Sequence, residues 1–452
     1  MTTSAMQPVR RGRLSEEADW HRQYEELKVT AEEAAALIQD GDGVAMPAAA
    51  SWPYAVDEAL VRRLRAIGGR VELYSLFTPA DTVLLQPENR DLVEYYVNFL
   101  SGDRALISQG NVHFVPTHLS EDGAWICDRH PRVTVITCAP PDENGWMSRS
   151  ISASHLDRTV LEQSELVIVE VNPRLPALSS DGECHLLFHV SEADAIVESD
   201  HPLAENIPAP ATEVDETIAG YIAEMVPNGA CVQFGLGGLP NAIGECLAYA
   251  GKRDLGLHTE VVTNCAMKLM EQGVVNNSRK QLYPGRSVGA LCVGDRDLWA
   301  FANGNRDLCF KEVKWVNDPR TICQNDGVVS INNAMEIDLT GQVNAESVGP
   351  RMYSGTGGQL EWVTGAQWSK GGKSIIALRS SYRDRSGTLH SKILPQLSPG
   401  GIVTTPRTMV QYVATEYGVA NLKYRSCRER AKALIAIAHP AFREELERNL
   451  PL

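Results

Sequence analysis

The sequence lacks the features that mark several common classes of protein. Its ten cysteines are scattered, and no CxxC pair or Cys/His spacing suggests a zinc site. No run approaches the roughly 18 consecutive apolar residues that a membrane-spanning helix needs. Acidic residues outnumber basic ones by 57 to 42, and the formal charge of −15 disfavours unassisted binding to nucleic acid or anionic membrane. We therefore expect no metal ion, no nucleic acid and no membrane among the partners.

The cysteines and the N-terminal segment predict where the protein works. Most cysteines have apolar neighbours, as Cys138 and Cys292 do, which is typical of reduced residues in a core. No apolar stretch follows Arg10, Arg11 and Arg13, so we expect no signal peptide. Because reduced thiols are typical of the cytosol, a soluble cytoplasmic protein is expected.

The length and the residue pattern predict an α/β protein of two domains. A chain of 452 residues is too long for one ordinary core. After a polar arm that ends near Trp20, short β-rich runs alternate with amphipathic stretches, which favours parallel α/β units. The strands expected in the first half are Gly43–Met46, Val71–Leu76, Val112–Val115, Val133–Thr137 and Leu166–Val171, and the helices include Ala31–Ile38 and Ala55–Ile67.

A proline-rich stretch at residues 202–210 is the best linker. It separates an expected α/β domain at 1–201 from a second at 211–452, so the expected fold is two tandem α/β domains with mainly parallel sheets. The helices expected in the second domain are Asp215–Met225, Asn241–Ala250, Ala266–Gln272, Cys427–Ala438 and Phe442–Asn449. Its expected strands are Ala230–Phe234, Leu255–Thr263, Ser374–Leu378, Ile402–Thr404 and Tyr412–Thr415.

One carboxylate and two glycine-rich turns stand out in the second domain. Glu260 ends an apolar run, and the turns are Gly235–Pro240 and Gly355–Gly358. The carboxyl edge of a parallel sheet is where ligands bind, and glycine lets backbone N–H groups approach a reacting carbonyl. The bland alternatives are a surface or helix-starting glutamate and turns needed only for packing.

Other candidate motifs are weaker. The first turn does not have the dinucleotide spacing GxGxxG, and Gly371–Ser374 resembles a P-loop ending only superficially, so no nucleotide cofactor is expected. Lys370 and Lys373 could neutralise a phosphate or could simply be solvated. His258 is better interpreted as an ordinary structural or surface histidine, and packing explains Cys265 as well as a place near the pocket does.

These pieces, in this order, resemble the acetyl-CoA hydrolase/transferase family, and within it the 4-hydroxybutyrate and butyrate:acetate CoA-transferases of class I. The resemblance covers most of the chain and is densest in the second half. The segments that carry it there are Gln233–Asn241, His258–Glu260, Val316–Pro319, Gln324–Asp326, Ser354–Gln359, Ser369–Ser374, Thr415–Ala420 and Arg428–Leu434. Those that carry it earlier are Pro140–Asp142, Asn144–Gly145 and Val171–Pro176.

The resemblance implies a role for each of these segments. Glu260 would be the nucleophile of a CoA-transferase-type fold with the active site between two α/β domains. The oxyanion donors would be backbone amides at Leu236, Gly237, Gly355, Gly357 and Gly358. Expected contacts of coenzyme A are Gly235, Gly238, Gln359, Gly365, Lys370 and Lys373. The substrates would be an acyl-CoA and a small carboxylate resembling 4-hydroxybutyrate, butyrate or acetate, and a homo-oligomer is expected by analogy.

The implied reaction moves CoA by a ping-pong mechanism through a glutamyl-CoA thioester at Glu260. Two alternatives are an acyl-CoA hydrolase that uses the same glutamate and a non-catalytic CoA-binding subunit. The chain departs from the family pattern at several positions. After the GGQ segment the family commonly has Asp-Phe and a nearby arginine, whereas this chain has Glu361, Trp362 and Thr364. Asn264 and Cys265 replace Asp-Gly of the family pattern, and the segment Ala48–Pro53 lacks the usual His/Gly-rich form. They lie where the acyl group would be selected.

Overall fold

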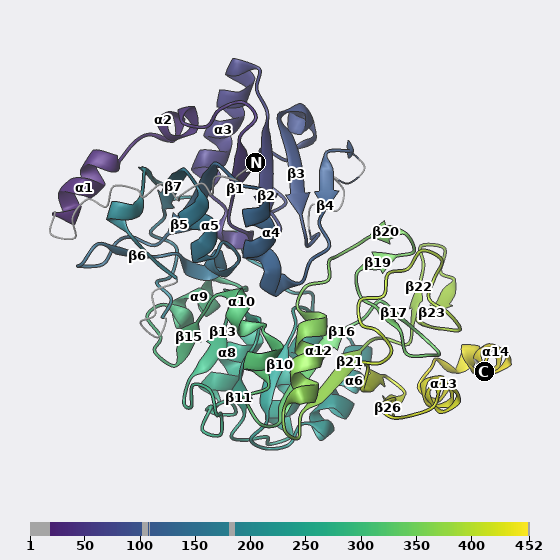
Figure 1. Cartoon of the computed structure of the whole chain (residues 1–452). Coiled ribbons are helices and arrows are strands. Elements are labelled where there is room, and N and C mark those ends of the chain that lie inside the picture. Colours follow the sequence, from purple (N-terminus) through teal and green to yellow (C-terminus); the bar gives the residue numbers. More distant parts are fainter. Residues whose placement is uncertain (1–18, 102–106, 108, 180–185, 451–452) are drawn as a thin grey trace, which may run out of the picture. The chain divides into compact units, whose positions relative to one another are not determined.

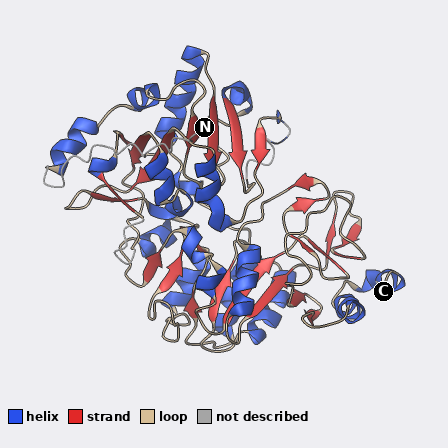
Figure 2. Cartoon of the chain, in the orientation of Figure 1, coloured by secondary structure: helices blue, strands red, loops and turns tan. Residues whose placement is uncertain are grey.

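The computed structural model describes residues 19–101, 107, 109–179 and 186–450 (Figure 1). The expected polar arm, its three arginines and Cys184 lie outside the described residues. The chain forms two compact units. Unit 1 comprises residues 1–205, 299–305 and 310–314, and unit 2 comprises residues 206–298, 306–309 and 315–452. The expected α/β class is confirmed, since both units contain helices and strands (Figure 2).

Unit 1 contains a seven-stranded parallel sheet with the order β4-β3-β2-β1-β5-β7-β9. Its strands β5 (Val133–Cys138) and β7 (Leu166–Val171) are almost wholly buried, as in parallel sheets covered on both faces. The others are β1 (Gly43–Ala45), β2 (Val71–Ser75), β3 (Val93–Val97), β4 (Val112–Phe114) and β9 (Ala195–Glu198), with an antiparallel pair β6 (Trp146–Ser148) and β8 (Leu187–His189). The α-helices are α1 (Trp20–Leu27), α2 (Ala31–Ala36), α3 (Tyr54–Ile67), α4 (Asp122–Asp128) and α5 (Arg158–Gln163).

Unit 2 contains a six-stranded sheet with the order β11-β10-β16-β21-β25-β26, in which only the last pair is antiparallel. Its strands are β11 (Gly256–Leu257), β10 (Cys231–Phe234), β16 (Val328–Asn333), β21 (Lys373–Ala377), β25 (Tyr412–Thr415) and β26 (Gly418–Asn421). The helices that lie on or beside it are α6 (Glu213–Met225), α7 (Gly238–Tyr249), α8 (Asn264–Glu271), α12 (Gln359–Trp368), α13 (Cys427–Ala436) and α14 (Arg443–Arg448).

The remaining elements are short and connect or extend these sheets. The strands are β12 (Val261–Val262), β13 (Ser287–Gly289), β14 (Leu291–Cys292), β15 (Leu308–Phe310), β17 (Glu336–Asp338), β18 (Val343–Asn344), β19 (Ser347–Val348), β20 (Arg351–Met352), β22 (Ser381–Arg383), β23 (Leu389–Ser391) and β24 (Ile393–Leu394). The helices are α9 (Arg296–Ala302), α10 (Val313–Val316) and α11 (Pro319–Ile322). Among the described residues, no helix has both the length and the apolar character needed to cross a membrane.

Local sequence explains where several helices begin and end. Helix α6 follows a capping box, in which Thr212 Oγ1 accepts a hydrogen bond from the N–H of Asp215 and the Asp215 carboxylate accepts one from the N–H of Thr212. Helix α3 ends at Gly68, which has the left-handed φ of +63° that glycine adopts without strain.

Two expected strands of the second domain are wrong. The run Leu255–Thr263 is not one strand, because β11 pairs with β10 whereas β12 pairs with β14 in a separate two-stranded sheet. The N–H of His258 still donates to the carbonyl of Val232 in β10, but the N–H of Thr259 donates to the carbonyl of Val288 in β13. Residues 402–404 form no strand, and Ile402 and Val403 are 40% and 42% exposed. The next residue, Thr405, instead forms an isolated antiparallel bridge with Val343.

Candidate active site

The carboxyl edge of the sheet in unit 2 gathers the glycine-rich turns. The first turn directly follows β10, and the second directly precedes α12. Gln359 ties the start of α12 to this edge, because its Nε2 donates to the carbonyl of Asn333, the last residue of β16, at 2.8 Å. Gln359 Oε1 accepts a hydrogen bond from Thr405 Oγ1 at 2.9 Å. Both ends of this side chain are therefore occupied by the protein itself.

Glu260 lies in the connection between β11 and β12, at the same edge. Its backbone carbonyl accepts hydrogen bonds from the N–H groups of Ala290 and Leu291, at 3.2 and 2.9 Å. Its partly buried carboxylate lies against the second turn: a Cβ atom placed on Gly358 would be 2.0 Å from Glu260 Oε2. Only glycine allows the backbone to come so close to this carboxylate. The structure thus brings Glu260 and Gly358 together.

Asn317 is the closest polar partner of Glu260. Its Nδ2 donates to Glu260 Oε2 at 2.8 Å and to Glu361 Oε2 at 3.1 Å. Asn317 is fully buried and stands just before Asp318, the N-cap of α11. The sequence interpretation included Val316–Pro319 in the family resemblance but gave Asn317 no role. The Asn-Asp-Pro turn signals a helix start, but nothing in it indicates which carboxylate the asparagine meets.

His258 holds the segment that carries Asn317. Its Nε2 lies 3.1 Å from the carbonyl of Val316, so this nitrogen must carry the proton, and Nδ1 then accepts from Asn325 Nδ2 at 3.2 Å. The ring stacks on Trp315. Burial lowers the pKa of His258 to about 3 and keeps it neutral. His258 is therefore a structural histidine, the ordinary role that the sequence favoured.

Burial also raises the pKa of Glu260 above its ordinary value. The amide of Asn317 opposes this shift by donating to the charged form, and the indole of Trp362 does so to a smaller extent. Trp362 Nε1 forms no hydrogen bond of normal geometry with the described residues, so Asn317 is the stronger partner. A partly desolvated carboxylate held by one amide is, in its ionised form, a more basic oxygen than a solvated one.

The first turn follows β10, which pairs with β11, the strand that leads to Glu260. Thr259 Oγ1 donates to the carbonyl of Phe234, which immediately precedes Gly235, at 3.3 Å. Gly237 has a φ of +124°, and α7 begins at Gly238 rather than near Asn241. Gly238 also packs tightly, because a Cβ there would lie 2.9 Å from the carbonyl of Ala209. Leu236 is 39% exposed. The turn therefore presents backbone at the edge where Glu260 lies.

Three further residues for which contact with coenzyme A is predicted lie in β21, just before it, and within α12. Lys373 starts β21 at the opposite, amino edge of the sheet, where its Nζ donates to the carbonyl of Met225. Lys370, which is exposed, belongs to the same edge, since its carbonyl accepts from Gly327, just before β16. Gly365 lies within α12, where a Cβ would be 2.6 Å from the side chain of Ile322. The structure does not bring these residues to Glu260.

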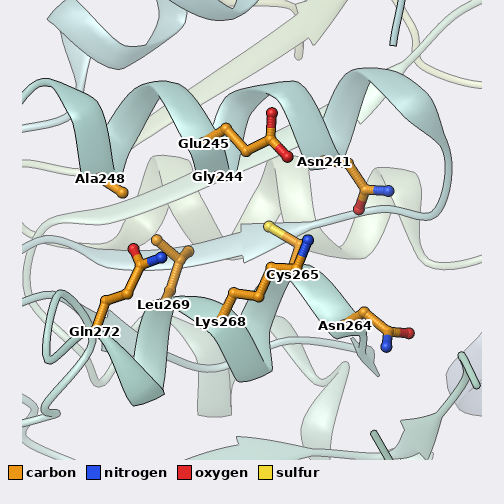
Figure 3. A pocket seen from close by; sticks show the side chains of 9 residues that line it. All are labelled: Asn241, Gly244, Glu245, Ala248, Asn264, Cys265, Lys268, Leu269 and Gln272. Carbon is orange, nitrogen blue, oxygen red and sulfur yellow. The ribbon is translucent and has the colours of Figure 1, made fainter. Parts of the chain in front are cut away.

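A groove of about 190 Å³ lies between α7 and α8 (Figure 3). It is lined in part by Asn264 and Cys265, the two residues that replace Asp-Gly of the family pattern. Cys265 is buried at the helix crossing, where a Cβ on Gly244 would lie 2.0 Å from its Sγ. Burial raises the pKa of this thiol to about 12. Asn264 Nδ2 donates to Asp295 at 2.6 Å. The packing of α7 against α8 therefore explains the burial of Cys265. Across the described residues, no group of three or more His, Cys, Asp or Glu side chains could hold a metal ion.

Comparison with known proteins matches both parts of the chain to one family. The Acetyl-CoA hydrolase/transferase N-terminal domain matches residues 12–208, and the corresponding C-terminal domain matches residues 294–450. The chain is 36% identical to the butyryl-CoA:acetate CoA-transferase of Anaerostipes caccae, over 94% of this chain and 96% of that protein. It is 38% identical to the succinyl-CoA:cyclohexane-1-carboxylate CoA transferase of Geobacter metallireducens, over 94% and 95%. The crystal structure of 4-hydroxybutyrate CoA-transferase from Porphyromonas gingivalis matches with 31% identity and a TM-score of 0.80, over 95% and 98%.

Proposed function

The chain belongs to the acetyl-CoA hydrolase/transferase family and is a CoA-transferase, and from this we propose that Glu260 is the nucleophile that moves CoA from an acyl-CoA to a carboxylate. The observation that supports this role is the placement of the Glu260 carboxylate against Gly358 and Asn317. There it is held by one hydrogen bond, and its raised pKa makes the oxygen more basic.

In the proposed first half-reaction, a carboxylate oxygen of Glu260 attacks the thioester carbonyl. The C–S bond breaks, CoA leaves as a thiolate, and a mixed acyl-glutamyl anhydride forms. The thiolate then attacks the side-chain carbonyl carbon of Glu260, the anhydride C–O bond breaks, and the original acyl group leaves as a carboxylate. Glu260 now carries CoA as a thioester. An incoming carboxylate reverses these steps, so the thioester energy is conserved and no ATP is needed.

Each addition places negative charge on a former carbonyl oxygen. We assign the donors that stabilise it to backbone N–H groups of the two turns, at Leu236 and Gly237 and at Gly355, Gly357 and Gly358. Loss of one such donor typically costs about 10²–10³ in rate. Contact with CoA is assigned to Gly235 and Gly238, because they lie at the edge of the sheet that carries Glu260.

We propose short-chain carboxylates as substrates, and butyryl-CoA with acetate is the first pair to test, after the name of the Anaerostipes caccae relative. Because CoA stays on the enzyme between the half-reactions, initial rates at several acetate concentrations should give parallel double-reciprocal lines. Without acetate, butyrate release should stop after about one equivalent per site, because CoA remains bound to Glu260 as a thioester and no free thiol is released. Continued release of butyrate together with free thiol would identify a hydrolase, and no release of butyrate would identify a non-catalytic CoA-binding subunit.

The protein is further proposed to be a cytoplasmic homo-oligomer that works without a metal ion, nucleic acid or membrane. The reaction above supports the absence of a metal, since each step needs only oxygen and sulfur nucleophiles and N–H donors. The formal charge of −15 supports the absence of nucleic acid and of anionic membrane. Size-exclusion chromatography with light scattering measures the oligomeric state directly.

Replacing Asn317 by alanine should shift the pH dependence of the reaction. The Asn317 amide lowers the pKa of Glu260, so its removal should raise that pKa further. Less of the reactive carboxylate is then present in acid, and the acid limb of kcat/KM should move to higher pH. The lost charged hydrogen bond should lower kcat/KM on the order of 10- to 100-fold at neutral pH.

A second asparagine provides the matched control for this prediction. Asn264 also donates to a carboxylate in unit 2, but its partner is Asp295 rather than Glu260. Asn264→Ala should therefore leave the acid limb of kcat/KM at its wild-type pH. If both variants moved the limb equally, Asn317 would have no specific effect on Glu260.

A further inference from the structure

A buried amide joins two carboxylates at the proposed nucleophile. Asn317 Nδ2 lies 2.8 Å from Glu260 Oε2 and 3.1 Å from Glu361 Oε2. Glu361 comes from the first turn of α12 and is 6% exposed, and Asn317 is fully buried. A primary amide has two N–H donors on its nitrogen. Each carboxylate therefore accepts one of the two hydrogens, and Glu361 is bound to the same group that binds Glu260.

The second carboxylate determines which way the amide faces. A rotation of the amide by 180° would place Oδ1 where Nδ2 now lies, so an acceptor would face an acceptor. In the present orientation Asn317 Oδ1 is buried without a hydrogen-bond partner among the described residues, so the nitrogen alone fixes the amide. With Glu260 as the single acceptor, this orientation would depend on one hydrogen bond. Glu361 supplies a second bond, and both favour the same rotamer.

We propose that Glu361 is a positioning residue that keeps Asn317 Nδ2 facing Glu260 throughout the reaction. This inference rests on the proposed function, because Glu260 loses its charge when it becomes an anhydride or a thioester. Its attraction for the Asn317 amide then weakens. Glu361 is not consumed and remains an acceptor in every step. The N–H of Asn317 thus stays in place for the next addition, when negative charge returns to the Glu260 oxygen.

The surroundings of Asn317 make such positioning effective. The backbone just before it is held by the hydrogen bond between His258 and the Val316 carbonyl. The helix that carries Glu361 is fixed at its start by Gln359, which bonds the end of β16. Both the amide and the carboxylate that orients it are thus attached to rigid elements. Geometry of this kind matters because a misplacement of about 1 Å at an active site can cost about 10²-fold in rate.

The test is a double-mutant cycle with Glu361→Met and Asn317→Ala, measured with butyryl-CoA and acetate. Glu361→Met keeps the length of the side chain but removes the acceptor. We expect kcat to fall about tenfold, the KM for butyryl-CoA to change less than threefold, and the acid limb of kcat/KM to move to higher pH. Because Glu361 acts through Asn317, the double variant should be no slower than Asn317→Ala alone. The proposal would be overturned if the losses in kcat of the two single variants were additive in the double variant. It would also be overturned if the Glu361→Met variant had wild-type kinetics.

Glu361→Gln is the conservative variant, and it keeps the proposal testable if Glu361→Met does not fold. The glutamine carbonyl can still accept from Asn317, so kcat should stay within about threefold of wild type. A loss of more than tenfold would show that the charge of Glu361, and not its acceptor, is needed. Failure of the proposed function looks different: Glu260→Ala would then retain turnover. If Glu260→Ala lost turnover but the losses in kcat of Glu361→Met and Asn317→Ala were additive, only the role of Glu361 would be rejected.

Discussion

Glu260→Ala is expected to lower kcat for CoA transfer from butyryl-CoA to acetate by about 10⁴-fold or more, because loss of a covalent nucleophile removes the whole reaction path. In the proposed mechanism, its carboxylate forms both covalent intermediates in turn. Residual binding by the two turns cannot replace it, since a backbone N–H stabilises an oxyanion but does not attack a carbonyl.

The covalent intermediate provides a second readout. Wild-type enzyme incubated with butyryl-CoA and then borohydride should carry an alcohol at residue 260, detected by mass spectrometry of the peptide, since borohydride reduces a thioester. Glu271→Ala is the matched control: Glu271 is an exposed glutamate at the end of α8, and its variant should keep wild-type turnover and labelling. An unmodified wild-type peptide, together with full turnover of Glu260→Ala, would reject the mechanism.

The sequence predicted the parts of the fold that depend on local patterns. The apolar runs of β5 and β7 are long enough to identify buried parallel strands, and β7 has the expected bounds, Leu166–Val171. The same reasoning failed at residues 258–260, where the chain leaves one sheet for another. All residues from Leu255 to Thr259 are buried, so no change in the hydrophobic pattern marks the break. The break depends on β14, a partner some 30 residues away that pairs with β12.

Glu260 could be proposed as the nucleophile from the sequence, whereas the residues that contact its carboxylate could not be predicted. It belongs to the three-residue segment His258–Glu260, which follows the glycine-rich segment Gln233–Asn241 in the family resemblance. Asn317 is 57 residues from Glu260 and 44 from Glu361, so only the folded chain brings the three together. Contact of Lys370 and Lys373 with CoA, which the resemblance implies for the segment after the second turn, stays a prediction. Helix α12 separates them from that turn and carries the chain to the opposite edge of the sheet.

Gly358→Ala should be the most damaging small substitution in the second turn, with kcat lowered about 10²-fold or more. The added methyl group would lie 2.0 Å from Glu260 Oε2 and 2.3 Å from Asn317 Nδ2, far inside van der Waals contact. Glu260 must then move, and the Asn317 hydrogen bond must lengthen. The matched control is Gly220→Ala in α6, where a Cβ meets nothing within 4 Å and alanine favours the helix. Thermal unfolding separates lost activity from lost folding. Wild-type kcat in folded Gly358→Ala enzyme would mean that the close approach of this turn to Glu260 has no part in catalysis.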